Sequence, residues 1–343
     1  MKEIRVMVVE DSRVAREWLV HVLESSPGIS VVGTASDGEE AIKNAMRIRP
    51  DVITMDVHMP KMGGLDATRR IMEIYPIPII IVSGSADPED VKTTFNAMES
   101  GALAFVPRPP GLGHSDQETC ARELVQVVKA MAEVKLVRRW PKGKFLSSRT
   151  ETAVELVAIG ASTGGPPVLQ GILSAMPNNF PLPILIVQHM AAGFLQGFAQ
   201  WLSQTSALPV ALARHGEVMA PSRVYIAPDG YQMKVEKGGR ISLTLDDPEN
   251  GLRPSVSFLF RSVSDHFGPA SVAGLLTGMG RDGAREMKLL KEKGAVTFVQ
   301  DRESAVVYGM AGEALRLDGA TYVLAPEHIA PFLAAMANKR ARP

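Results

Sequence analysis

The chain has very little cysteine, and this scarcity limits the kinds of site that it can build. Cys120 is the only cysteine among the 343 residues. An internal disulfide and a metal site made of several thiolates are therefore excluded. We expect Cys120 to be a small buried apolar side chain.

Long apolar runs and an excess of charge of either sign are also missing. No apolar run approaches the roughly 20 residues that cross a bilayer, and Glu10 and Asp11 come too early for the apolar region of a signal peptide. The basic and the acidic side chains number 37 each, which does not favour a nucleic-acid partner. We expect a cytoplasmic protein without direct membrane insertion.

The sequence does contain enough apolar material for two folded domains. Its 343 residues exceed the usual size of one core, and 45% of them are hydrophobic. We place the first domain at residues 1–128, a linker at residues 129–152 and the second domain at residues 153–343. Within the linker, the stretch KLVRRWPKGKFLSSRT loses periodicity and gathers basic residues, proline, glycine and serines, as flexible tethers do.

Short apolar runs alternate with helical segments in the first domain. This alternation predicts a parallel, doubly wound α/β sheet of the flavodoxin-like order 2-1-3-4-5, in which the first and third strands are neighbours. After the opening run IRVMVV, the expected strands are residues 29–33, 52–55, 77–82 and 102–106. The helix after the first strand is expected to bury Val14, Trp18, Leu19, Val22 and Leu23.

Three carboxylates follow two of these strands. Glu10 and Asp11 come after the first run and Asp56 comes after the third, so the predicted strand order brings them together. Because like charges repel, such a pocket needs a cation, and hard oxygen ligands suit Mg²⁺. Helix caps or turn acids would explain one of these residues alone, but Ser83 and Arg108 also stand at strand ends.

The second domain repeats the alternation of strands and helices. A polar hairpin, YQMKVEKGGRISLTL, interrupts the series and is expected to turn at Gly238 and Gly239. The pattern predicts a second doubly wound parallel sheet, of a Rossmann-like kind. Its expected strands are residues 156–159, 184–187, 224–227, 272–277, 296–299 and 322–324.

Ser162 follows the first strand of this domain, in the stretch GASTGGP. The carboxyl edge of an open parallel sheet is where ligands bind, and glycines let the backbone approach a substrate closely. On these residues alone, a glycine-rich turn that caps the next helix, or a phosphate cradle, is the competing interpretation. No G-x-S-x-G elbow is present.

His189 and Asp282 follow two other strands, so the sheet would bring them to the edge that holds Ser162. In a Ser-His-Asp triad the neutral imidazole takes the serine proton, and the acid orients the imidazole and stabilises its charged form. A core histidine and a helix cap are the alternatives for His189 and Asp282. Asp229 and Asp301 also stand near strand ends and compete for the role of the acid.

The motifs EDS, TMDVHMPKMGGLDATRRI, IVSGS and FVPRP make the first domain resemble a bacterial response-regulator receiver domain. The resemblance implies that Asp56 is phosphorylated by a histidine kinase. It also implies that Glu10, Asp11 and Asp56 bind Mg²⁺ together with the backbone carbonyl of His58.

The same resemblance implies that Ser83 and Phe105 form the switch pair of the receiver. The family usually has lysine where this chain has Arg108. The charge is kept, but a planar guanidinium replaces a point charge. We expect the rate of phosphate sensing or the shape of the switch to differ.

The motifs GASTGGP, VQHM, YIAPDG, RPSV, LLTGMGRDGA and QDRESAVVYGM, in this order after a receiver, resemble the chemotaxis protein-glutamate methylesterase family, CheB. The resemblance covers nearly the whole chain. It implies that Ser162 is the nucleophile, His189 the general base and then acid, and Asp282 the orienting acid. It also implies that Thr163 helps to hold the histidine and that the backbone amide of Met279 is an oxyanion donor.

This family hydrolyses methyl esters of glutamate on chemoreceptors (methyl-accepting chemotaxis proteins) and releases methanol, and deamidation of receptor glutamine uses the same triad. The resemblance implies that the resting receiver covers the active site, that phosphorylation relieves the inhibition, and that the esterase reaction needs no cofactor. A phosphorylation-controlled binding module or phosphate sink without catalysis is the alternative function. A transcriptional regulator is less favoured, because the second domain is rich in strands and the net charge is zero.

Three positions depart from the family pattern, and none belongs to the expected triad. The family usually has histidine near Gln232, and its G-H-R-P-S-V-D pattern has histidine and aspartate where this chain has Leu252 and Ser257. We expect these departures to affect the substrate and the packing of the domains more than the reaction.

Overall fold

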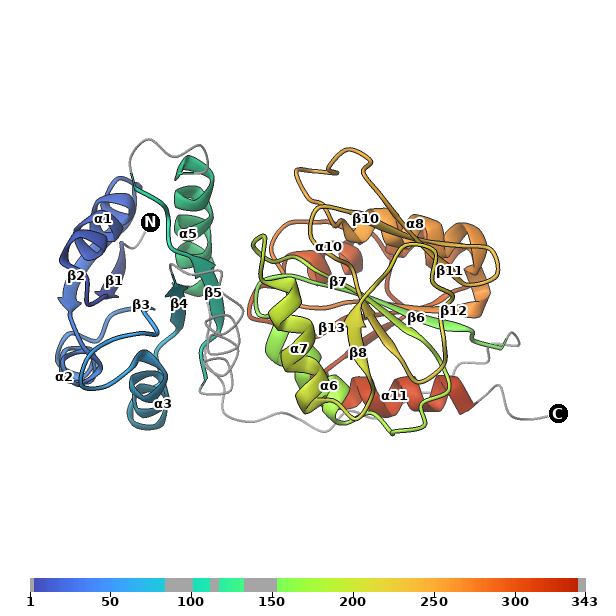
Figure 1. Ribbon diagram of the computed structural model, residues 1–343, viewed down its shortest axis with the longest axis horizontal. Coiled ribbons are helices and arrows are strands. Elements are labelled where there is room, and N and C mark those ends of the chain that lie inside the picture. The colour runs from blue at the N-terminus through green and yellow to red at the C-terminus, as the bar shows by residue number, and fades with distance from the viewer. Residues whose placement is uncertain (1–2, 84–100, 112–116, 133–152, 339–343) are drawn as a thin grey trace. The chain divides into compact units, whose positions relative to one another are not determined.

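The computed structural model describes residues 3–83, 101–111, 117–132 and 153–338 (Figure 1). The chain divides into two compact units, Met1–Leu136 and Val137–Pro343, and each has a hydrophobic core of its own. We refer to them, after the domains that the sequence led us to expect, as the receiver unit and the catalytic unit. Helix α5 (Gln117–Ala132) runs past the expected domain end at residue 128. Most of the expected linker lies outside the described residues, so the predicted domain limits stay predictions.

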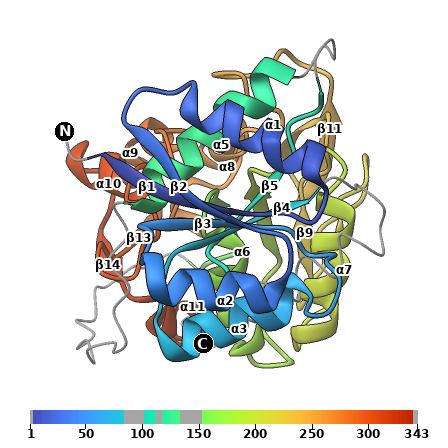
Figure 2. The ribbon, with the colours of Figure 1, turned by 90° about the vertical axis from the view of Figure 1, so that its left-hand side faces the viewer.

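The receiver unit is a five-stranded parallel sheet in the order β2-β1-β3-β4-β5. This order confirms the predicted flavodoxin-like sheet. Helices α1 (Arg13–Glu24) and α5 lie on one face, and α2 (Gly38–Ile48) and α3 (Gly64–Ile74) lie on the other (Figure 2). The strands are β1 (Ile4–Val9), β2 (Ile29–Ala35), β3 (Val52–Met55), β4 (Ile79–Ser83) and β5 (Ala104–Pro107).

The central strands of the receiver unit are continuous apolar runs because helices cover both faces of the sheet. Strands β3 and β4 are buried along their whole length. Helix α1 buries Leu19, Val22 and Leu23 as predicted, whereas Trp18 is only half-buried. Two predictions are wrong: Val14 is 79% exposed and Cys120 is half-buried. Both lie in the first turn of their helices. The buried residues of α1 and α5 lie in later turns, from Leu19 and Leu124 onward.

The first two receiver helices begin at side-chain caps. Ser12 Oγ accepts a hydrogen bond from the backbone N–H of Ala15 at 3.4 Å, and Asp37 Oδ1 accepts one from Glu40 at 2.9 Å. Such caps satisfy N–H groups that have no partner within the helix. Because the Ser12 cap starts α1 almost directly after β1, the preceding residues are held in a short loop at the carboxyl end of that strand.

The catalytic unit is a seven-stranded parallel sheet in the order β14-β13-β12-β6-β7-β9-β8. This sheet confirms the second doubly wound domain. Helices α6 (Gly165–Ser174), α7 (Leu195–Thr205) and α11 (Pro326–Asn338) pack together, as do α8 (Val256–His266), α9 (Ala284–Glu292) and α10 (Met310–Arg316). The strands are β6 (Leu156–Ala161), β7 (Ile184–Gln188), β8 (Val210–Leu212), β9 (Val224–Ile226), β12 (Ser271–Leu275), β13 (Val296–Gln300) and β14 (Tyr322–Leu324).

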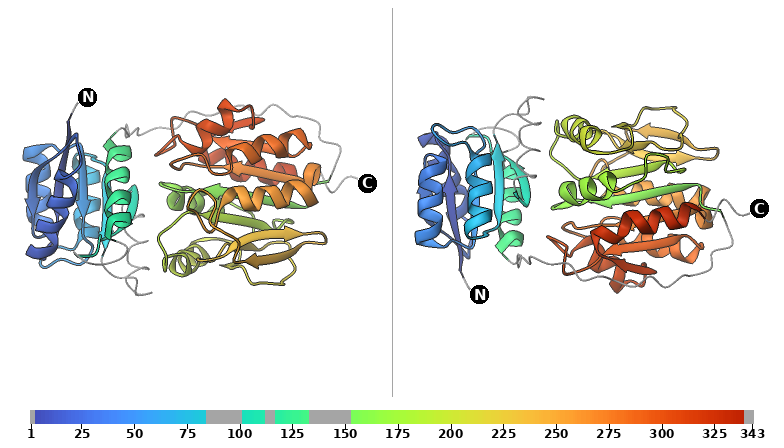
Figure 3. Two further views of the ribbon diagram at one scale, coloured as in Figure 1. Left: turned by 90° about the horizontal axis from the view of Figure 1, so that it is seen from above. Right: turned by 90° about the horizontal axis from the view of Figure 1, so that it is seen from below.

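The antiparallel hairpin is confirmed as β10 (Gln232–Glu236) and β11 (Arg240–Thr244), which pack beside α8 (Figure 3). Strand β8 was not predicted, because three residues at the edge of a sheet carry no readable periodicity. Strand β12 ends earlier than expected, since the backbone N–H of Thr277 donates to the Gln300 side chain at 2.9 Å instead of to a strand. No described helix is long and apolar enough to cross a membrane.

Candidate active site and acidic cluster

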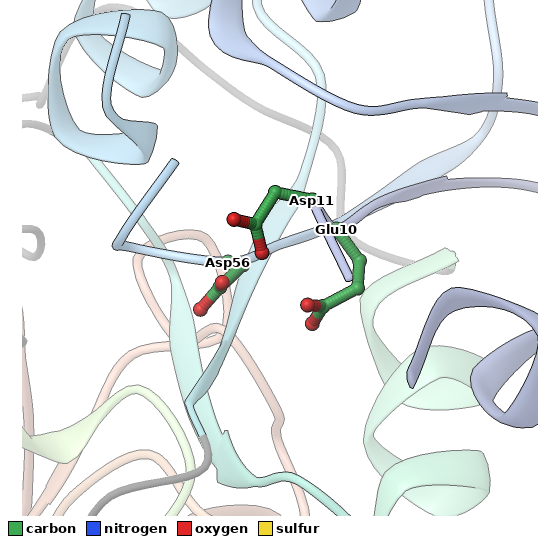
Figure 4. Close-up of side chains that lie close together, drawn as sticks. All are labelled: Glu10, Asp11 and Asp56. Atoms are coloured by element: carbon green, nitrogen blue, oxygen red, sulfur yellow. The ribbon is translucent and has the colours of Figure 1, made fainter. Parts of the chain in front are cut away.

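Three carboxylates meet at the carboxyl edge of the receiver sheet (Figure 4). Glu10 and Asp56 directly follow Val9 and Met55, which are paired in the parallel ladder between β1 and β3. One oxygen from each of Glu10, Asp11 and Asp56 lies within 4.8 Å of the others. Glu10 and Asp56 are buried, whereas Asp11 is exposed. This confirms that the strand order brings the three predicted ligands together.

Burial and like charge make this cluster costly without a cation. Burial, followed by the neighbouring Asp56 carboxylate, raises the pKa of Glu10 to about 7. Burial also raises the pKa of Asp56, and Arg108 partly offsets that rise. Among the described residues, Glu10 Oε2 is buried without a hydrogen-bond partner. An acidic set of hard oxygens with an unsatisfied buried oxygen fits a divalent cation such as Mg²⁺.

Arg108 places one guanidinium nitrogen between two of the carboxylates. Its Nη2 lies 2.8 Å from Glu10 Oε2 and 3.3 Å from Asp56 Oδ2. The distance to Glu10 is that of an ion pair, but the geometry of this contact is not that of a hydrogen bond. The backbone N–H of Arg108 donates to the carbonyl of Ser83 at 2.8 Å. The basic residue expected to sense the phosphate is therefore already at the acidic cluster.

The remaining predicted receiver residues lie near this edge in the sheet. Ser83 ends β4 and is buried, and Phe105 lies in the neighbouring strand β5, half-buried. His58 is exposed in the loop after β3. The switch roles of Ser83 and Phe105, and the His58 carbonyl as a ligand, stay predictions. The indole N–H of Trp18 donates to the carbonyl of Pro109 at 3.1 Å, a contact that the sequence did not indicate.

Ser162 directly follows β6 and lies in a tight turn before α6. Its N–H donates to the Thr277 carbonyl at 3.0 Å, and its own carbonyl accepts from Gly165 at 2.8 Å. Gly164 has φ +79°, a left-handed conformation that favours glycine. A Cβ on Gly165 would lie 2.2 Å from Gln188 Oε1. The glycines of GASTGGP thus serve a sharp turn, as predicted, and make room for the Gln188 side chain. The close approach to a substrate stays a prediction.

His189 lies beside Ser162 because the two residues follow paired positions on neighbouring strands. Ala161 ends β6 and pairs with Gln188, which ends β7. The Gln188 side-chain amide donates to the carbonyls of Ser162 and His189, at 2.9 and 2.8 Å. Gln188 was not predicted as a site residue. A polar residue at the end of a buried strand is the signal that could have found it.

His189 and Asp282 form the contact that the strand ends predicted. His189 Nε2 lies 2.8 Å from Asp282 Oδ2, although the residues are 93 positions apart. The His189 side chain is 10% exposed and that of Asp282 is 2% exposed. Among the described residues, the other ring nitrogen of His189, Nδ1, makes no hydrogen bond. In the described part of the chain, the hydroxyl of Ser162 makes no hydrogen bond.

Asp282 is held as an anion at the amino terminus of α8. Its carboxylate accepts hydrogen bonds from Val256 N at 2.6 Å, Ser257 N at 3.1 Å and Ser255 Oγ at 2.8 Å. Burial alone would raise the pKa of Asp282, but the hydrogen bonds, with that of His189 foremost, lower it to about 2. The carboxylate is therefore ionised at neutral pH. It faces the start of α8, where N–H groups and the helix dipole favour a negative charge.

The rival acids have other partners. Asp229 Oδ2 accepts from the backbone N–H of Gly193 at 3.0 Å, and burial raises the pKa of Asp229. Asp301 accepts hydrogen bonds from the backbone and hydroxyl of Ser304. Asp282 is therefore the carboxylate that the structure places against His189.

Two of the departures from the family pattern belong to the support of Asp282. Gln232 is fully buried, and its Oε1 accepts from Ser255 N at 2.9 Å. Its amide nitrogen donates to the carbonyl of Leu252 at 3.2 Å. Ser257 Oγ accepts from the backbone N–H of Gly283 at 2.9 Å. These positions hold the loops around Asp282, a role that sequence reasoning missed.

The remaining two predicted residues lie in the turns next to Ser162. The Thr163 carbonyl accepts from Thr277 Oγ1 at 2.9 Å. Met279 is half-buried and follows Gly278, where a Cβ would come within 2.6 Å of Ser162 Cβ. The loop that carries Met279 thus packs directly on Ser162. The expected roles of Thr163 and of the Met279 amide stay predictions.

Two family models match this chain in agreement with the geometry. The model described as CheB methylesterase matches residues 157–333, and the response regulator receiver domain matches residues 6–113. The chain belongs to the CheB methylesterase family. This confirms the predicted family and its combination with a receiver domain.

Relatives similar to this CheB chain extend over nearly its whole length. A protein-glutamate methylesterase/protein-glutamine glutaminase of Nitrosospira multiformis is 57% identical, covering 98% of each chain. Another, from Geobacter metallireducens, is 53% identical and covers 98% of this chain and 100% of that protein. The solved CheB methylesterase catalytic domain of Thermotoga maritima is 36% identical with a TM-score of 0.52, covering 54% of this chain and 100% of that domain.

Proposed function

We propose that this chain hydrolyses methyl esters of glutamate side chains on chemoreceptors and releases methanol. The observation that carries the proposal is the 2.8 Å contact between His189 and the buried Asp282 beside Ser162. The names of the relatives from Nitrosospira multiformis and Geobacter metallireducens support the substrate. A binding module without catalysis would not need a paired histidine and carboxylate next to a serine.

In the first half of the reaction, Ser162 Oγ attacks the ester carbonyl carbon. The hydroxyl proton passes to His189, and because Nε2 bonds to Asp282 the accepting nitrogen is Nδ1. The tetrahedral intermediate then expels the methoxy group, which takes the proton from Nδ1 and leaves as methanol. The glutamyl group remains on Ser162 as an acyl-enzyme.

In the second half, a water molecule attacks the acyl-enzyme. His189 Nδ1 takes a proton from the water and returns one to Ser162 Oγ as the ester bond breaks. The products are the free serine and a glutamic acid side chain, which loses its remaining proton to the solvent and becomes a carboxylate. The ionised Asp282 stabilises the imidazolium in both halves and fixes the tautomer with its proton on Nε2.

The negative charge on the carbonyl oxygen needs donors close to Ser162. We assign the backbone amide of Met279 to this role, since its loop packs on Ser162 at Gly278. Thr163, the residue after the nucleophile, is assigned to holding the His189 ring. Attack on a glutamine side chain by the same groups would release ammonia, and the relatives' names support this second activity.

We also assign control of the reaction to the receiver unit, with Asp56 as the residue that a histidine kinase phosphorylates. Glu10, Asp11 and Asp56, with the His58 carbonyl, would hold Mg²⁺, whose charge offsets that of the carboxylates and of the phosphoryl group. Arg108, Ser83 and Phe105 would sense the phosphate. In this proposal the unphosphorylated receiver inhibits the esterase, and phosphorylation of Asp56 relieves the inhibition. The protein would work in the cytoplasm.

The direct test measures methanol release from membranes that contain methylated chemoreceptors. The full-length chain with Mg²⁺ should release methanol, and more of it when a small phosphodonor such as acetyl phosphate is added. The Asp56→Asn variant should stay at the resting rate under both conditions. A wild-type chain that becomes phosphorylated and releases no methanol would refute the proposed activity.

A further inference from the structure

Arg281 stands in the rim of the active site, between two contacts with the catalytic residues. Its loop follows β12. Gly278 in this loop packs against Ser162, where an added Cβ would lie 2.6 Å from Ser162 Cβ. At the other end of the loop, Asp282 bonds His189. Arg281 lies between these two points in the loop and is exposed.

Arg285 adds a second guanidinium to the same rim. It lies in the first turn of α9 and is also exposed. Arg281 lies in the loop before this helix and is separated from its first residue by Asp282 and Gly283. In the part of the chain that the structure describes, the guanidinium of neither arginine makes a hydrogen bond or an ion pair.

The nearby acid does not balance these charges. Glu313 forms two hydrogen bonds with Arg316, each of 2.7 Å. The Arg316 hydrogen bond is the main cause of the lowered pKa of Glu313, and weaker attraction from Arg281 and Arg285 adds to it. The Glu313 carboxylate is thus occupied by Arg316, and Arg281 and Arg285 lie near it without forming an ion pair.

The other acids of these elements are already paired. Glu286, in the same turn of α9 as Arg285, contacts Ser257 at 2.7 Å and Arg261 at 3.2 Å. Asp282 is buried against His189. The two exposed arginines are therefore available to an acidic ligand from outside the chain.

We propose that Arg281 and Arg285 bind carboxylates that flank the reacting glutamate ester on the substrate. The inference rests on the proposed function and specifies its substrate as an acidic protein segment. Guanidinium groups bind carboxylates through paired hydrogen bonds. A helical substrate with acidic side chains three or four residues from the reacting side chain would present both on one face.

The two arginines would contact carboxylates that take no part in the reaction. Their contacts should therefore stabilise the bound substrate and the transition state equally. Loss of both arginines should then raise KM and leave kcat within about twofold. Exposed ion pairs are worth about 0.2–1 kcal/mol each, so Arg281→Gln with Arg285→Gln should weaken binding about fivefold. The remaining affinity should depend less on salt.

The test uses two synthetic helical peptides that carry the same glutamate γ-methyl ester, flanked in one by glutamates and in the other by glutamines. Binding is measured by fluorescence anisotropy to the full-length Ser162→Ala chain, with Mg²⁺ and acetyl phosphate, so that no turnover is needed. This chain should prefer the glutamate peptide. The double glutamine variant should lose the preference, and Arg281→Lys with Arg285→Lys should keep most of it.

Lys237→Gln provides the matched control, since it removes one exposed positive charge elsewhere in the same unit. Along β10, Gln232 contacts Ser255 at the start of α8, and Val235 contacts Ser262 further along that helix. Lys237 follows β10 at the hairpin turn, so it lies beyond Val235, away from Asp282. This variant should keep the full preference for the glutamate peptide.

An equal preference in the unmodified and double glutamine chains, or no preference at all, would overturn the inference. Failure of the proposed function looks different. If the wild-type chain released no methanol but the arginines still set the preference in binding, the acidic-ligand site would stand and the esterase proposal would fall.

Discussion

Asp282 is a buried carboxylate that keeps its charge because donors surround it. The sequence placed it at a strand end as one of three candidates for the acid of a triad, beside Asp229 and Asp301, and the family resemblance implied that Asp282 is that acid. The sequence did not show why it remains ionised, because the donors come from the start of α8, a segment that precedes it by 25 to 27 residues. The roles of Gln188 and Gln232 were missed for a similar reason, since their side-chain amides bond backbone carbonyls of Ser162 and Leu252, which lie in other loops.

Replacement of Asp282 by asparagine should cripple the esterase and spare the receiver. Without the charge, the tautomer and the imidazolium of His189 lose their support, and kcat should fall roughly 10³-fold or more. Methanol release by the phosphorylated full-length chain measures the loss. Asp301→Asn should stay near the wild-type rate, since Asp301 bonds Ser304. A larger loss in Asp301→Asn than in Asp282→Asn would reverse the assignment of the acid.

The low pKa of Asp282 also predicts how the stability of the catalytic unit depends on pH. The folded value of about 2 lies below the ordinary value of 3.8, so folding favours the ionised form. This contribution is present above about pH 4 and is lost as the pH falls towards 2; the shift corresponds to about 2 kcal/mol. In urea unfolding between pH 5 and pH 2, the gap in free energy of unfolding between wild type and Asp282→Asn should shrink by about that amount. A gap independent of pH would contradict the assigned pKa.

The turns after β6, β7 and β12 carry Ser162, His189 and Asp282, and strand periodicity was enough to place all three at one edge of the sheet. The same reasoning placed the loops after β1 and β3 in the receiver unit. It failed where an element is short or where a helix begins. Strand β8 has three residues, and Val14 follows the expected periodicity but lies in the first turn of α1. Whether a residue in a short strand or a first helical turn is buried depends on which elements pack against it, and the periodicity of its own segment carries no information about that.

Gly278→Ala tests whether the turn after β12 sets the position of Ser162. The new Cβ would lie 2.5 Å from Met310 Sδ and 2.6 Å from Ser162 Cβ, so one of these groups must move. Such overpacking costs about 1–3 kcal/mol, and it should lower esterase activity at least tenfold. Phosphorylation of Asp56 should be unchanged, because Gly278 belongs to the other unit. Full activity in this variant would show that Ser162 tolerates displacement.

The molecule as a whole consists of two units with separate hydrophobic cores. The count of two domains and both sheet types followed from length and from the alternation of strands and helices. How one unit controls the other did not follow from these patterns, because docking depends on surfaces and not on periodicity. Control of the catalytic unit by the receiver unit was inferred from the family resemblance, and it stays a prediction.

Removal of residues 1–150 should raise esterase activity above that of the unphosphorylated full-length chain. If the resting receiver covers the active site, the shortened chain has lost its inhibitor and should no longer respond to acetyl phosphate. Methanol release by both chains, at equal concentration and with and without the phosphodonor, gives the comparison. Equal rates throughout would mean that the receiver does not gate the catalytic unit.

The central claim is that Ser162 is the nucleophile of a methylesterase, and the rate of methanol release by Ser162→Ala tests it most directly. Wild-type and variant full-length chains would be compared on methylated chemoreceptors with Mg²⁺ and acetyl phosphate, after equal phosphorylation of Asp56 has shown that the receiver is intact. The account predicts a loss of roughly 10³-fold or more in the variant. Retention of more than about a hundredth of the wild-type rate would contradict it.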